Sequence, residues 1–205
     1  SIFEQNDSTL WLASSGNGLQ KFIISYSNNE PEIIRSKHYR FFDYNSNYYT
    51  VIPENDSILW IGSRGNGAVR FNTVSEKYQI IQLRKEKEQM MNDILCIHID
   101  ADKTVWLGTS LGLNKIISYD ADSVIYQNYN ESDGLPNNTI HGILEDEKGI
   151  LWLSTNNGIV SFNKHTNMFN KVTNHSGSEI IEFSDNAYYE HLNSDNFFFG
   201  GVNGI

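Results

Sequence analysis

The chain has 205 residues, 39% of them hydrophobic and 13% aromatic, and it carries a formal net charge of −10. This composition supports a sizeable folded core, and no stretch approaches the ~20 apolar residues that a membrane helix requires. The acidic balance argues against a nucleic-acid partner, which normally meets a basic face, and against contact of this segment with an anionic membrane.

A short aromatic motif recurs along the chain in nearly constant register. Its copies, in chain order, are residues 10–14 (LWLAS), 59–63 (LWIGS), 105–109 (VWLGT), 151–155 (LWLST) and a weaker copy at 197–201 (FFFGG). The central aromatic residues are 49, 46, 46 and 46 positions apart, namely Trp11, Trp60, Trp106, Trp152 and Phe198. A self-similar period of this length indicates a repeat architecture.

Each copy of the motif lies between two turn signals. A polar turn precedes the aromatic residue, as at 55–57 and 147–149, and a glycine follows it six or seven positions later. These glycines are Gly18, Gly67, Gly112, Gly158 and Gly204. Asn and Gly tolerate the positive φ of tight hairpins, so the pattern predicts chain reversals on both sides of the aromatic strand.

One repeat therefore consists of four antiparallel strands. In the third copy we expect strands at 94–100, around Trp106, at 113–117 and at 124–129. The aromatic strand is apolar at consecutive positions, as at 151–153, which indicates burial on both faces. A sheet packed between two other sheets has that environment, and four-stranded sheets stacked around an axis form a β-propeller.

The predicted fold class is all-β, a β-propeller of four-stranded antiparallel blades with about four and a half blades present. The blade repeats run approximately over 1–46, 47–92, 93–138 and 139–185, with a partial blade at 186–205. Propellers close with about 4–8 blades, so the chain either closes as an unusually small ring or, as we expect, is a fragment of a larger propeller. The charged run at 84–88 is expected to be a loop between blades rather than a helix.

The sequence contains no arrangement typical of an active site. The six histidines occupy unrelated positions in the repeat, and no metal-ligand or nucleophile motif is present. We therefore predict no metal, no cofactor and no enzymatic activity for this segment. The single cysteine, Cys96, lies in an apolar run and is expected to be a buried structural thiol. The tryptophans recur in phase within strands, which favours core packing over sugar stacking.

The fourth copy resembles the two-component regulator propeller repeat. The resemblance is carried by 133–140 (DGLPNNTI), by 149–155 (GILWLST) and by Gly158-Ile159. It implies a propeller in the periplasmic ectodomain of a hybrid two-component histidine kinase, a class of sensor that commonly detects glycan fragments and controls polysaccharide utilisation. It also implies a homodimeric parent receptor. The chain itself has no counterpart of a kinase or regulator module.

A ligand site is expected where the loops between blades and the loops after each aromatic strand share one face. The residues that we single out there are Asn17, Arg64, Asn66, Asn156, Asn157, Tyr49 and Asn137. Amides and aromatic faces suit an oligosaccharide, and Arg64 suits a carboxylate or sulfate. Ordinary turn chemistry is the competing interpretation. Two other functions stay open: a scaffold that docks partners or a second copy, and a propeller lyase or glycosidase.

Overall fold

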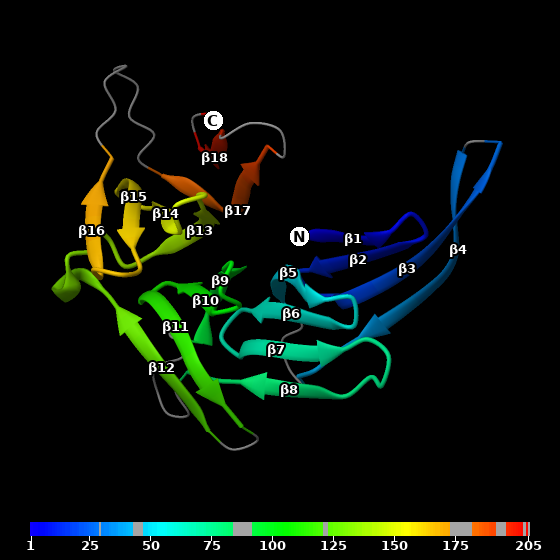
Figure 1. The fold of residues 1–205 in the computed structure, drawn as a ribbon. Helices are drawn as coiled ribbons and strands as arrows, with labels where there is room; N and C mark the ends of the chain where they lie inside the picture. Colours follow the sequence, from blue (N-terminus) through cyan, green and yellow to red (C-terminus); the bar gives the residue numbers. More distant parts are fainter. Residues whose placement is uncertain are drawn as a thin grey trace.

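The computed structural model describes residues 1–28, 30–42, 47–83, 92–120, 123–172, 182–191, 196–202 and 204, and this part of the chain is predominantly β-structure (Figure 1). It contains four four-stranded antiparallel sheets and one two-stranded sheet. A 3-10 turn, η2 (Glu131–Asp133), lies between the third and fourth sheets. The predicted all-β propeller fold is confirmed, and the loop predicted at 84–88 lies outside the described residues.

The sheets follow one another along the chain, and we name them blades 1 to 5. Blade 1 consists of β1 (Ile2–Asn6), β2 (Thr9–Ser14), β3 (Gly18–Ser27) and β4 (Glu30–Tyr39). Blade 2 consists of β5 (Tyr48–Asn55), β6 (Ile58–Ser63), β7 (Gly67–Asn72) and β8 (Tyr78–Ile81). Blade 3 consists of β9 (Ile94–Ile99), β10 (Val105–Thr109), β11 (Gly112–Tyr119) and β12 (Val124–Tyr129). Blade 4 consists of β13 (Ile140–Glu145), β14 (Ile150–Thr155), β15 (Gly158–Asn163) and β16 (Met168–Lys171), and blade 5 of β17 (Phe183–Glu190) and β18 (Phe197–Gly201).

The strands of each blade are hydrogen-bonded in chain order, and the first strand of a blade is its inner strand. Figure 1 shows β5, β9, β13 and β17 converging at the centre of the molecule, where β17 contacts the other three. Asn186 of β17 donates hydrogen bonds to the carbonyl oxygens of Tyr49, at 3.0 Å, and Leu95, at 2.9 Å. The inner strand of blade 5 is therefore tied directly to those of blades 2 and 3.

The observed strands can be compared with the limits expected from the repeat. In blade 3, β12 covers the expected 124–129, β9 ends one residue earlier than expected, and β11 is longer than 113–117. β17 begins at Phe183, so the expected boundary between 185 and 186 lies inside this strand. An irregularity in the β17–β18 register between Phe183 and Tyr188 accounts for the early start.

The glycines that follow the aromatic strands have the backbone conformation that the turns require. Gly67 and Gly112 have φ angles of 88° and 118°, in the left-handed region where other residues are strained. A Cβ atom on Gly112 would also collide with the carbonyl oxygen of Tyr129 on the outer strand of its blade. The tight turns predicted at these positions are confirmed.

Hydrophobic side chains fill the spaces between successive blades. Between blades 3 and 4, the Trp106 ring meets the Phe162 ring edge to face, with centroids 5.8 Å apart. Trp11 and Phe71 repeat this contact between blades 1 and 2, at 6.1 Å. Each of these tryptophans belongs to a core that it shares with the next blade. The blades are thus stacked face to face through a large aromatic ring on the second strand.

The tryptophans are core residues, as predicted, although one of them is only partly buried. Trp11, Trp60 and Trp106 are at most 1% exposed. Trp152 is half-buried beside Phe197 of the two-stranded blade 5. The strands β6 and β10 are buried along their whole length, as expected between two sheets. In β2, buried and half-buried residues alternate, because its buried face is the one that packs against blade 2.

The indole N–H of each tryptophan is held by a side chain six residues earlier. The pairs are Trp11–Gln5 (2.9 Å), Trp60–Glu54 (2.7 Å), Trp106–Asp100 (2.9 Å) and Trp152–Asp146 (2.9 Å). Asp146 also accepts the backbone N–H groups of Lys148 and Ile150. The acceptor therefore fixes both the indole and the polar turn that was evident in the sequence.

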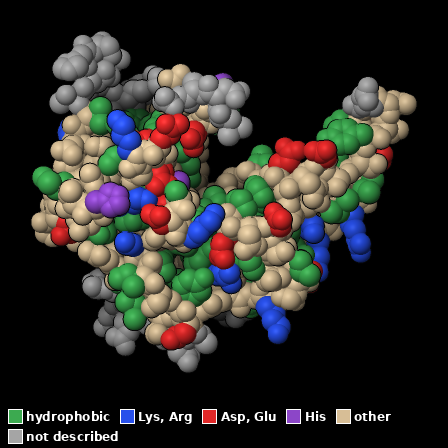
Figure 2. Space-filling model, viewed as in Figure 1, with side chains coloured by type: hydrophobic (Ala, Val, Ile, Leu, Met, Phe, Trp, Pro, Cys, Tyr) green, Lys and Arg blue, Asp and Glu red, His purple; other side chains and the backbone are tan. Residues whose placement is uncertain are grey.

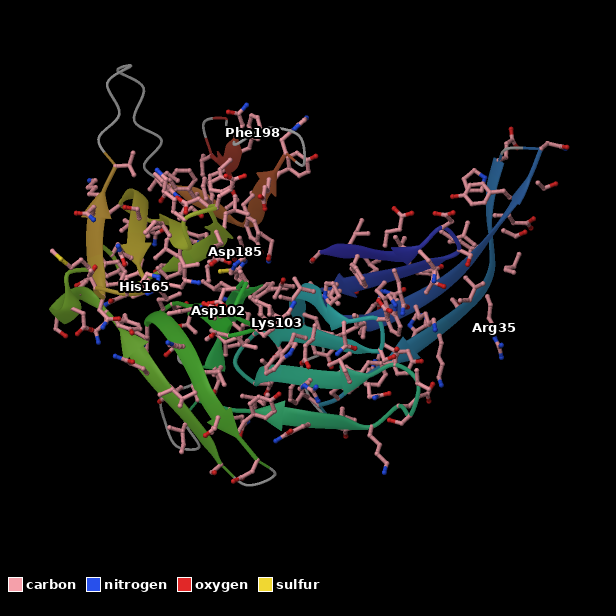
Figure 3. The ribbon with its side chains drawn as sticks, in the orientation of Figure 1. Arg35, Asp102, Lys103, His165, Asp185 and Phe198 are labelled. Atoms are coloured by element: carbon pink, nitrogen blue, oxygen red, sulfur yellow. The ribbon has the colours of Figure 1, made fainter. Side chains whose placement is uncertain are left out.

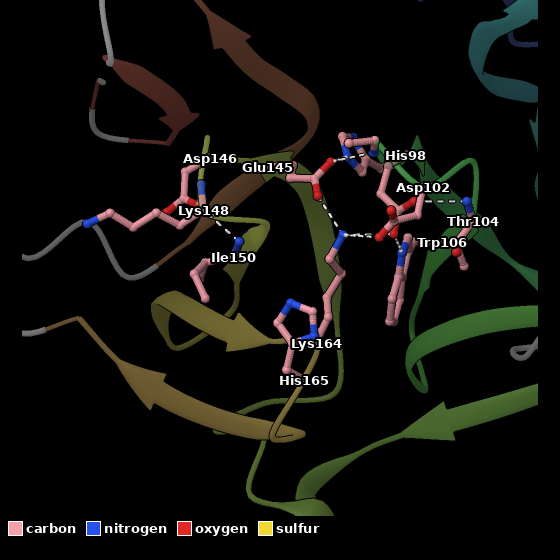
Figure 4. A network of polar contacts seen from close by, with 12 residues as sticks. His98, Asp102, Thr104, Trp106, Glu145, Asp146, Lys148, Ile150, Lys164 and His165 are labelled. Carbon is pink, nitrogen blue, oxygen red and sulfur yellow. Dashed lines mark hydrogen bonds and ion pairs between the residues drawn. The ribbon is translucent and has the colours of Figure 1, made fainter.

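A buried ion network joins blades 3 and 4 (Figure 4). Lys164, in the turn after β15, donates to Asp100 Oδ2 at 2.9 Å and to Glu145 Oε1 at 2.5 Å. Burial by itself lowers the pKa of Lys164, but its hydrogen bonds to Glu145 and Asp100 outweigh this and raise the pKa. His98, 3.5 Å from Glu145, has a pKa lowered mainly by burial, so it is neutral at pH 7. Lys164 is therefore the cation that compensates both carboxylates.

The first prediction concerns the indole hydrogen bond. Trp106→Phe keeps an aromatic ring in the core but removes the donor to Asp100, which is 3% exposed. We expect the free energy of unfolding to fall by about 1–3 kcal/mol, because a buried carboxylate oxygen loses a partner. Trp152→Phe is the matched control and should lose less, since Asp146 is more exposed. Urea unfolding measures both losses; equal values would show that ring volume alone matters.

The second prediction concerns the ion network. Lys164→Met should lower the free energy of unfolding by about 3–5 kcal/mol, because two buried carboxylates lose their cation. Adding Glu145→Gln to this variant should recover part of the loss. Lys148→Met, at an exposed position, should change stability by less than about 0.5 kcal/mol. Urea unfolding of the three variants tests this, and a small effect of Lys164→Met would contradict it.

Candidate ligand-binding site

Two kinds of loop meet at one edge of the blades. The strands of a blade are antiparallel and consecutive, so the turn between the second and third strands lies at the same end as the connection to the next blade. The turns hold the residues that follow each aromatic strand, and the connections lead into the inner strands. This edge is the face on which the sequence predicts a ligand.

Two repeat positions lie at each junction between blades on this edge. One is the fourth residue after the aromatic residue, which is Ser15, Arg64, Ser110 or Asn156. The other is the thirteenth residue before the next aromatic, which is Asn47, Asp93, Thr139 or Asp185. Between blades 1 and 2, Ser15 Oγ donates to Asn47 Oδ1 at 2.8 Å. Between blades 2 and 3, the charge of Arg64 attracts Asp93. The polar pair therefore changes from one junction to another.

Asp93 is an incompletely satisfied carboxylate at the junction of blades 2 and 3. Among the described residues, its Oδ1 atom is buried and has no hydrogen-bond partner. Burial raises the pKa of Asp93, the positive charge of Arg64 opposes this, and the negative charge of Asp185 adds to the rise. Arg64 also donates a hydrogen bond to the hydroxyl of Tyr49. A carboxylate, a guanidinium and a phenol thus lie together where β5 and β9 begin.

His141 links blades 4 and 5. Its Nδ1 atom lies 2.6 Å from Asp185 Oδ1, and its Nε2 atom lies 2.7 Å from Asn156 Oδ1. With an oxygen at each ring nitrogen, both nitrogens can donate only when the imidazole is protonated. Burial by itself lowers the pKa of His141, but the hydrogen bonds to Asp185 and Asn156 outweigh this and raise it.

These groups form one polar cluster, which we name the axial cluster. Its members are Tyr49, Arg64, Asp93, His141, Asn156 and Asp185. Figure 3 shows Asp185 at the centre of the molecule, near the point where the inner strands converge. The charges of Asp93 and Asp185 act on each other and on Tyr49. Blades 2, 3, 4 and 5 each contribute a member, so the cluster exists only when these blades are stacked.

Three of the seven residues selected from the sequence belong to the axial cluster: Tyr49, Arg64 and Asn156. Asn157, although adjacent to Asn156, accepts from Lys171 Nζ at 2.8 Å and donates to the Pro136 carbonyl oxygen at 3.3 Å.

The other three selected residues lie in turns. Asn66 donates to the carbonyl oxygen of Arg64 at 3.3 Å, and Asn137 accepts the backbone N–H of Thr139 at 3.0 Å. Asn17 is exposed in the β2–β3 turn of blade 1. The contacts of Asn66 and Asn137 are those of ordinary turn chemistry.

Sequence reasoning missed Asp93, His141 and Asp185. Their signal lies in the phase of the repeat rather than in any local motif. Asp93 and Asp185 share one repeat position, and His141 occupies in blade 4 the position that Tyr49 occupies in blade 2. Comparing inner strands position by position would have brought all three into consideration.

The axial cluster offers charge and hydrogen bonding. Within the described ranges, no group of three or more His, Cys, Asp or Glu residues is placed to hold a metal ion. Cys96 is fully buried, as predicted, and burial raises the pKa of its thiol. Its sulfur is therefore a packing group rather than a nucleophile. None of the described helical segments is long and apolar enough to cross a membrane.

The fold and the cluster define a class, a β-propeller with polar groups at the blade junctions. Within this class, residues 134–157 match the family model described as "Two component regulator propeller". The match includes β13, β14 and the start of the β14–β15 turn, and so contains His141 and Asn156. The chain carries a two-component regulator propeller repeat, and the resemblance evident in the sequence is confirmed.

Known proteins with similar sequences or structures place the repeat in context. Histidine kinase P4 of Formosa agariphila is 28% identical over an alignment that covers 67% of this chain and 14% of that protein. The extracellular domain of the hybrid two-component system BT4673 of B. thetaiotaomicron has a TM-score of 0.75 at 18% identity, over 98% of this chain and 28% of that one. Virginiamycin B lyase of Staphylococcus aureus has a TM-score of 0.59 at 14% identity, over 85% of this chain and 55% of that one. The two structural likenesses show the fold, and this fold also occurs in an enzyme.

The third prediction concerns the pH dependence of the His141 contact. Because the folded-state pKa of His141 is raised, its stabilising contribution is complete below about pH 6.5 and is lost as the pH rises through the folded value. His141→Gln should therefore cost more stability at about pH 6 than at about pH 8.5. Urea unfolding at both pH values measures the difference, with exposed His165→Gln as control. A cost that is the same at both pH values would contradict the prediction.

Proposed function

We propose that this chain belongs to the ligand-sensing region of a hybrid two-component receptor in the periplasm, and that its axial cluster binds an oligosaccharide. One observation carries the binding proposal: the buried Oδ1 atom of Asp93, which has no partner among the described residues and lies near Arg64 and Tyr49. The receptor assignment is supported by the two-component regulator propeller repeat and by the likeness to the extracellular domain of a two-component protein.

Sugar hydroxyls match the groups of the axial cluster. A hydroxyl can donate to Asp93 Oδ1 and accept from the Arg64 guanidinium at the same time. The ring of Tyr49 offers an apolar face beside them. Supplying a partner to a buried acceptor removes a desolvation penalty of about 1–3 kcal/mol. A ligand hydroxyl is therefore bound more strongly here than at an exposed carboxylate.

The distribution of the cluster over several blades suggests how binding is transmitted. Arg64 belongs to the β6–β7 turn of blade 2, and Asp93 directly precedes β9 of blade 3. A ligand that contacts both groups stabilises the arrangement of blades in which they face it. It shifts the receptor population only to the extent that it binds this arrangement better than others. In the proposed homodimer, this preference would change the contact between the two copies.

A second candidate function, docking of a protein partner or a second copy, is favoured by one feature of blade 1. The β3–β4 hairpin projects from the molecule, and Tyr26, Ile33 and Ile34 on it are 60%, 59% and 60% exposed (Figure 1). Grouped apolar side chains on a projecting element are typical of interaction surfaces. This function is compatible with sensing, since a receptor that signals through dimer contacts needs such a surface.

Catalysis by the axial cluster is disfavoured by the environment of His141. Both of its ring nitrogens are hydrogen-bonded, one to Asp185 and the other to Asn156. A histidine that acts as a general base needs a free nitrogen within reach of the substrate proton. These contacts support a structural role for His141 at the junction of blades 4 and 5.

The fourth prediction tests the binding proposal. Thermal unfolding of the chain with a panel of oligosaccharides should identify one class that raises the melting temperature in a dose-dependent way, without turnover. Asp93→Asn should weaken that binding about 10- to 100-fold, because a hydrogen bond to a charged acceptor is lost. Asp7→Asn, at an exposed turn on the opposite edge of the blades, should leave it unchanged.

Two outcomes would contradict the proposed sensing function. If no sugar shifts the melting temperature, docking becomes the better explanation, and a dependence of molecular mass on protein concentration would support it. If a sugar is bound but also cleaved, the protein is an enzyme on the propeller fold.

A further inference from the structure

The β3–β4 hairpin extends past the neighbouring blade. Its strands are each 10 residues long, whereas β7 and β8 of blade 2 have 6 and 4 residues. Figure 1 shows the hairpin as an arm that projects from the rest of the molecule. Residues of the hairpin and Glu76 of the β7–β8 turn line a cavity of about 280 Å³, which we name the rim pocket. Its lining includes Lys21, Ile23, Arg35, Lys37, Tyr39 and Glu76.

The rim pocket has an excess of positive charge. It contains three cations, Lys21, Arg35 and Lys37, and one carboxylate, Glu76. Its formal charge is thus +2, on a chain whose formal charge is −10. Figure 2 shows Lys and Arg side chains along one side of the projecting arm. A local positive field on an acidic protein attracts anions to that place.

The strand register places two of these cations directly opposite each other. Lys21 of β3 pairs with Lys37 of β4, and Arg35 lies two residues before Lys37, on the same face of the sheet. Like charges at directly opposed positions destabilise a strand pair. Glu76 accepts from Lys37 Nζ at 2.5 and 2.7 Å, and so offsets one of the three charges. An anion between Lys21 and Arg35 would neutralise the charge that Glu76 leaves uncompensated.

Within the described ranges, no carboxylate forms an ion pair with Lys21 or Arg35. The ammonium group of Lys21 lies 5.2 Å from the centroid of the Trp11 ring, a contact that orients it and leaves its charge in place. The Arg35 side chain makes no hydrogen bond or ion pair within the part of the chain that the structure describes, although its backbone pairs with Ile23. Figure 3 shows its side chain pointing away from the outer strand β4.

The equivalent positions of blades 2 and 3 carry no such excess. Arg70 is opposite Gln79 and is bound by both carboxylate oxygens of Glu54, at 2.7 and 2.6 Å. Lys115 lies 5.5 Å from the centroid of the Trp106 ring, but the residue opposite it is Gln127. The excess charge of blade 1 is therefore not a requirement of the repeat's packing.

We propose that the rim pocket binds an oxyanion, the carboxylate or sulfate ester of a single sugar ring. Arg35 and Lys21 donate charge-assisted hydrogen bonds to the oxyanion, and Ile23 and the Tyr39 ring pack against the carrier. The volume of about 280 Å³ lies just below the range for drug-sized ligand pockets, about 300–1,000 Å³, which suits one ring. The assignment of a sugar as the carrier rests on the proposed function, whereas the assignment of an anionic group does not. The pocket and Arg64 lie at opposite ends of β7, so the two sites are separate.

The fifth prediction is an NMR titration of the isotope-labelled chain with sodium glucuronate, glucose 6-sulfate and glucose at constant ionic strength. We expect saturable shifts of the Arg35 side-chain N–H signal with one or both anionic sugars, and none with glucose. Arg35→Gln should weaken binding about tenfold. Glu76→Gln should strengthen it about threefold, because the formal charge of the pocket rises by one.

Lys115→Gln is the matched control, because it removes a cation from the equivalent position of blade 3. It should leave the affinity unchanged, and so should Asp93→Asn. Equal losses of affinity in Arg35→Gln and Lys115→Gln would show that the binding depends only on net charge, and would overturn the proposed site. Equal shifts of the Arg35 side-chain N–H signal with sodium chloride would do the same. Loss of the titration in Asp93→Asn would overturn it as well. If neutral sugars do not bind at the axial cluster, anion binding at the rim pocket can still be observed, so the two proposals can be tested separately.

Discussion

The stacking of one blade on the next through the tryptophan of the second strand is the contact on which the rest of the structure depends. The ring is large enough to fill the space between two sheets, and it brings one polar atom into the core. Burying that N–H without an acceptor would cost about 1–3 kcal/mol. In blade 3 the acceptor is Asp100, which also takes part in the turn after the inner strand through the N–H of Thr104. Packing between blades and turn geometry within a blade are therefore set by the same side chain.

Features that depend on contacts within one repeat could be predicted from the sequence. Features that depend on contacts between blades could not. The register of the tryptophans and of Gly67 and Gly112 indicated the strands and turns, because both arise inside a blade. The local sequence does not distinguish Asn156 from Asn157, yet only Asn156 lies against His141. Which of two adjacent amides enters a junction depends on the neighbouring blade, which a local motif does not contain.

The two edges of the blades are used differently. At one edge, the polar pair changes from junction to junction, from Ser15 with Asn47 to Asn156 with Asp185, which His141 bridges, while the apolar cores beneath keep one pattern. At the other edge, Lys164 joins two acidic groups that are nearly inaccessible to water. A constant apolar framework allows the polar residues of the first edge to vary without loss of the fold.

The long outer strand β4 also affects the tendency of the protein to aggregate in solution. It is the edge of its sheet, and nearly all of its residues are exposed. Such an edge is a template on which another chain can add a strand and begin to aggregate. Pro31 removes one backbone donor, and Glu32 and Arg35 place charges of both signs along the strand. These residues therefore oppose the addition of another strand at the open edge of β4.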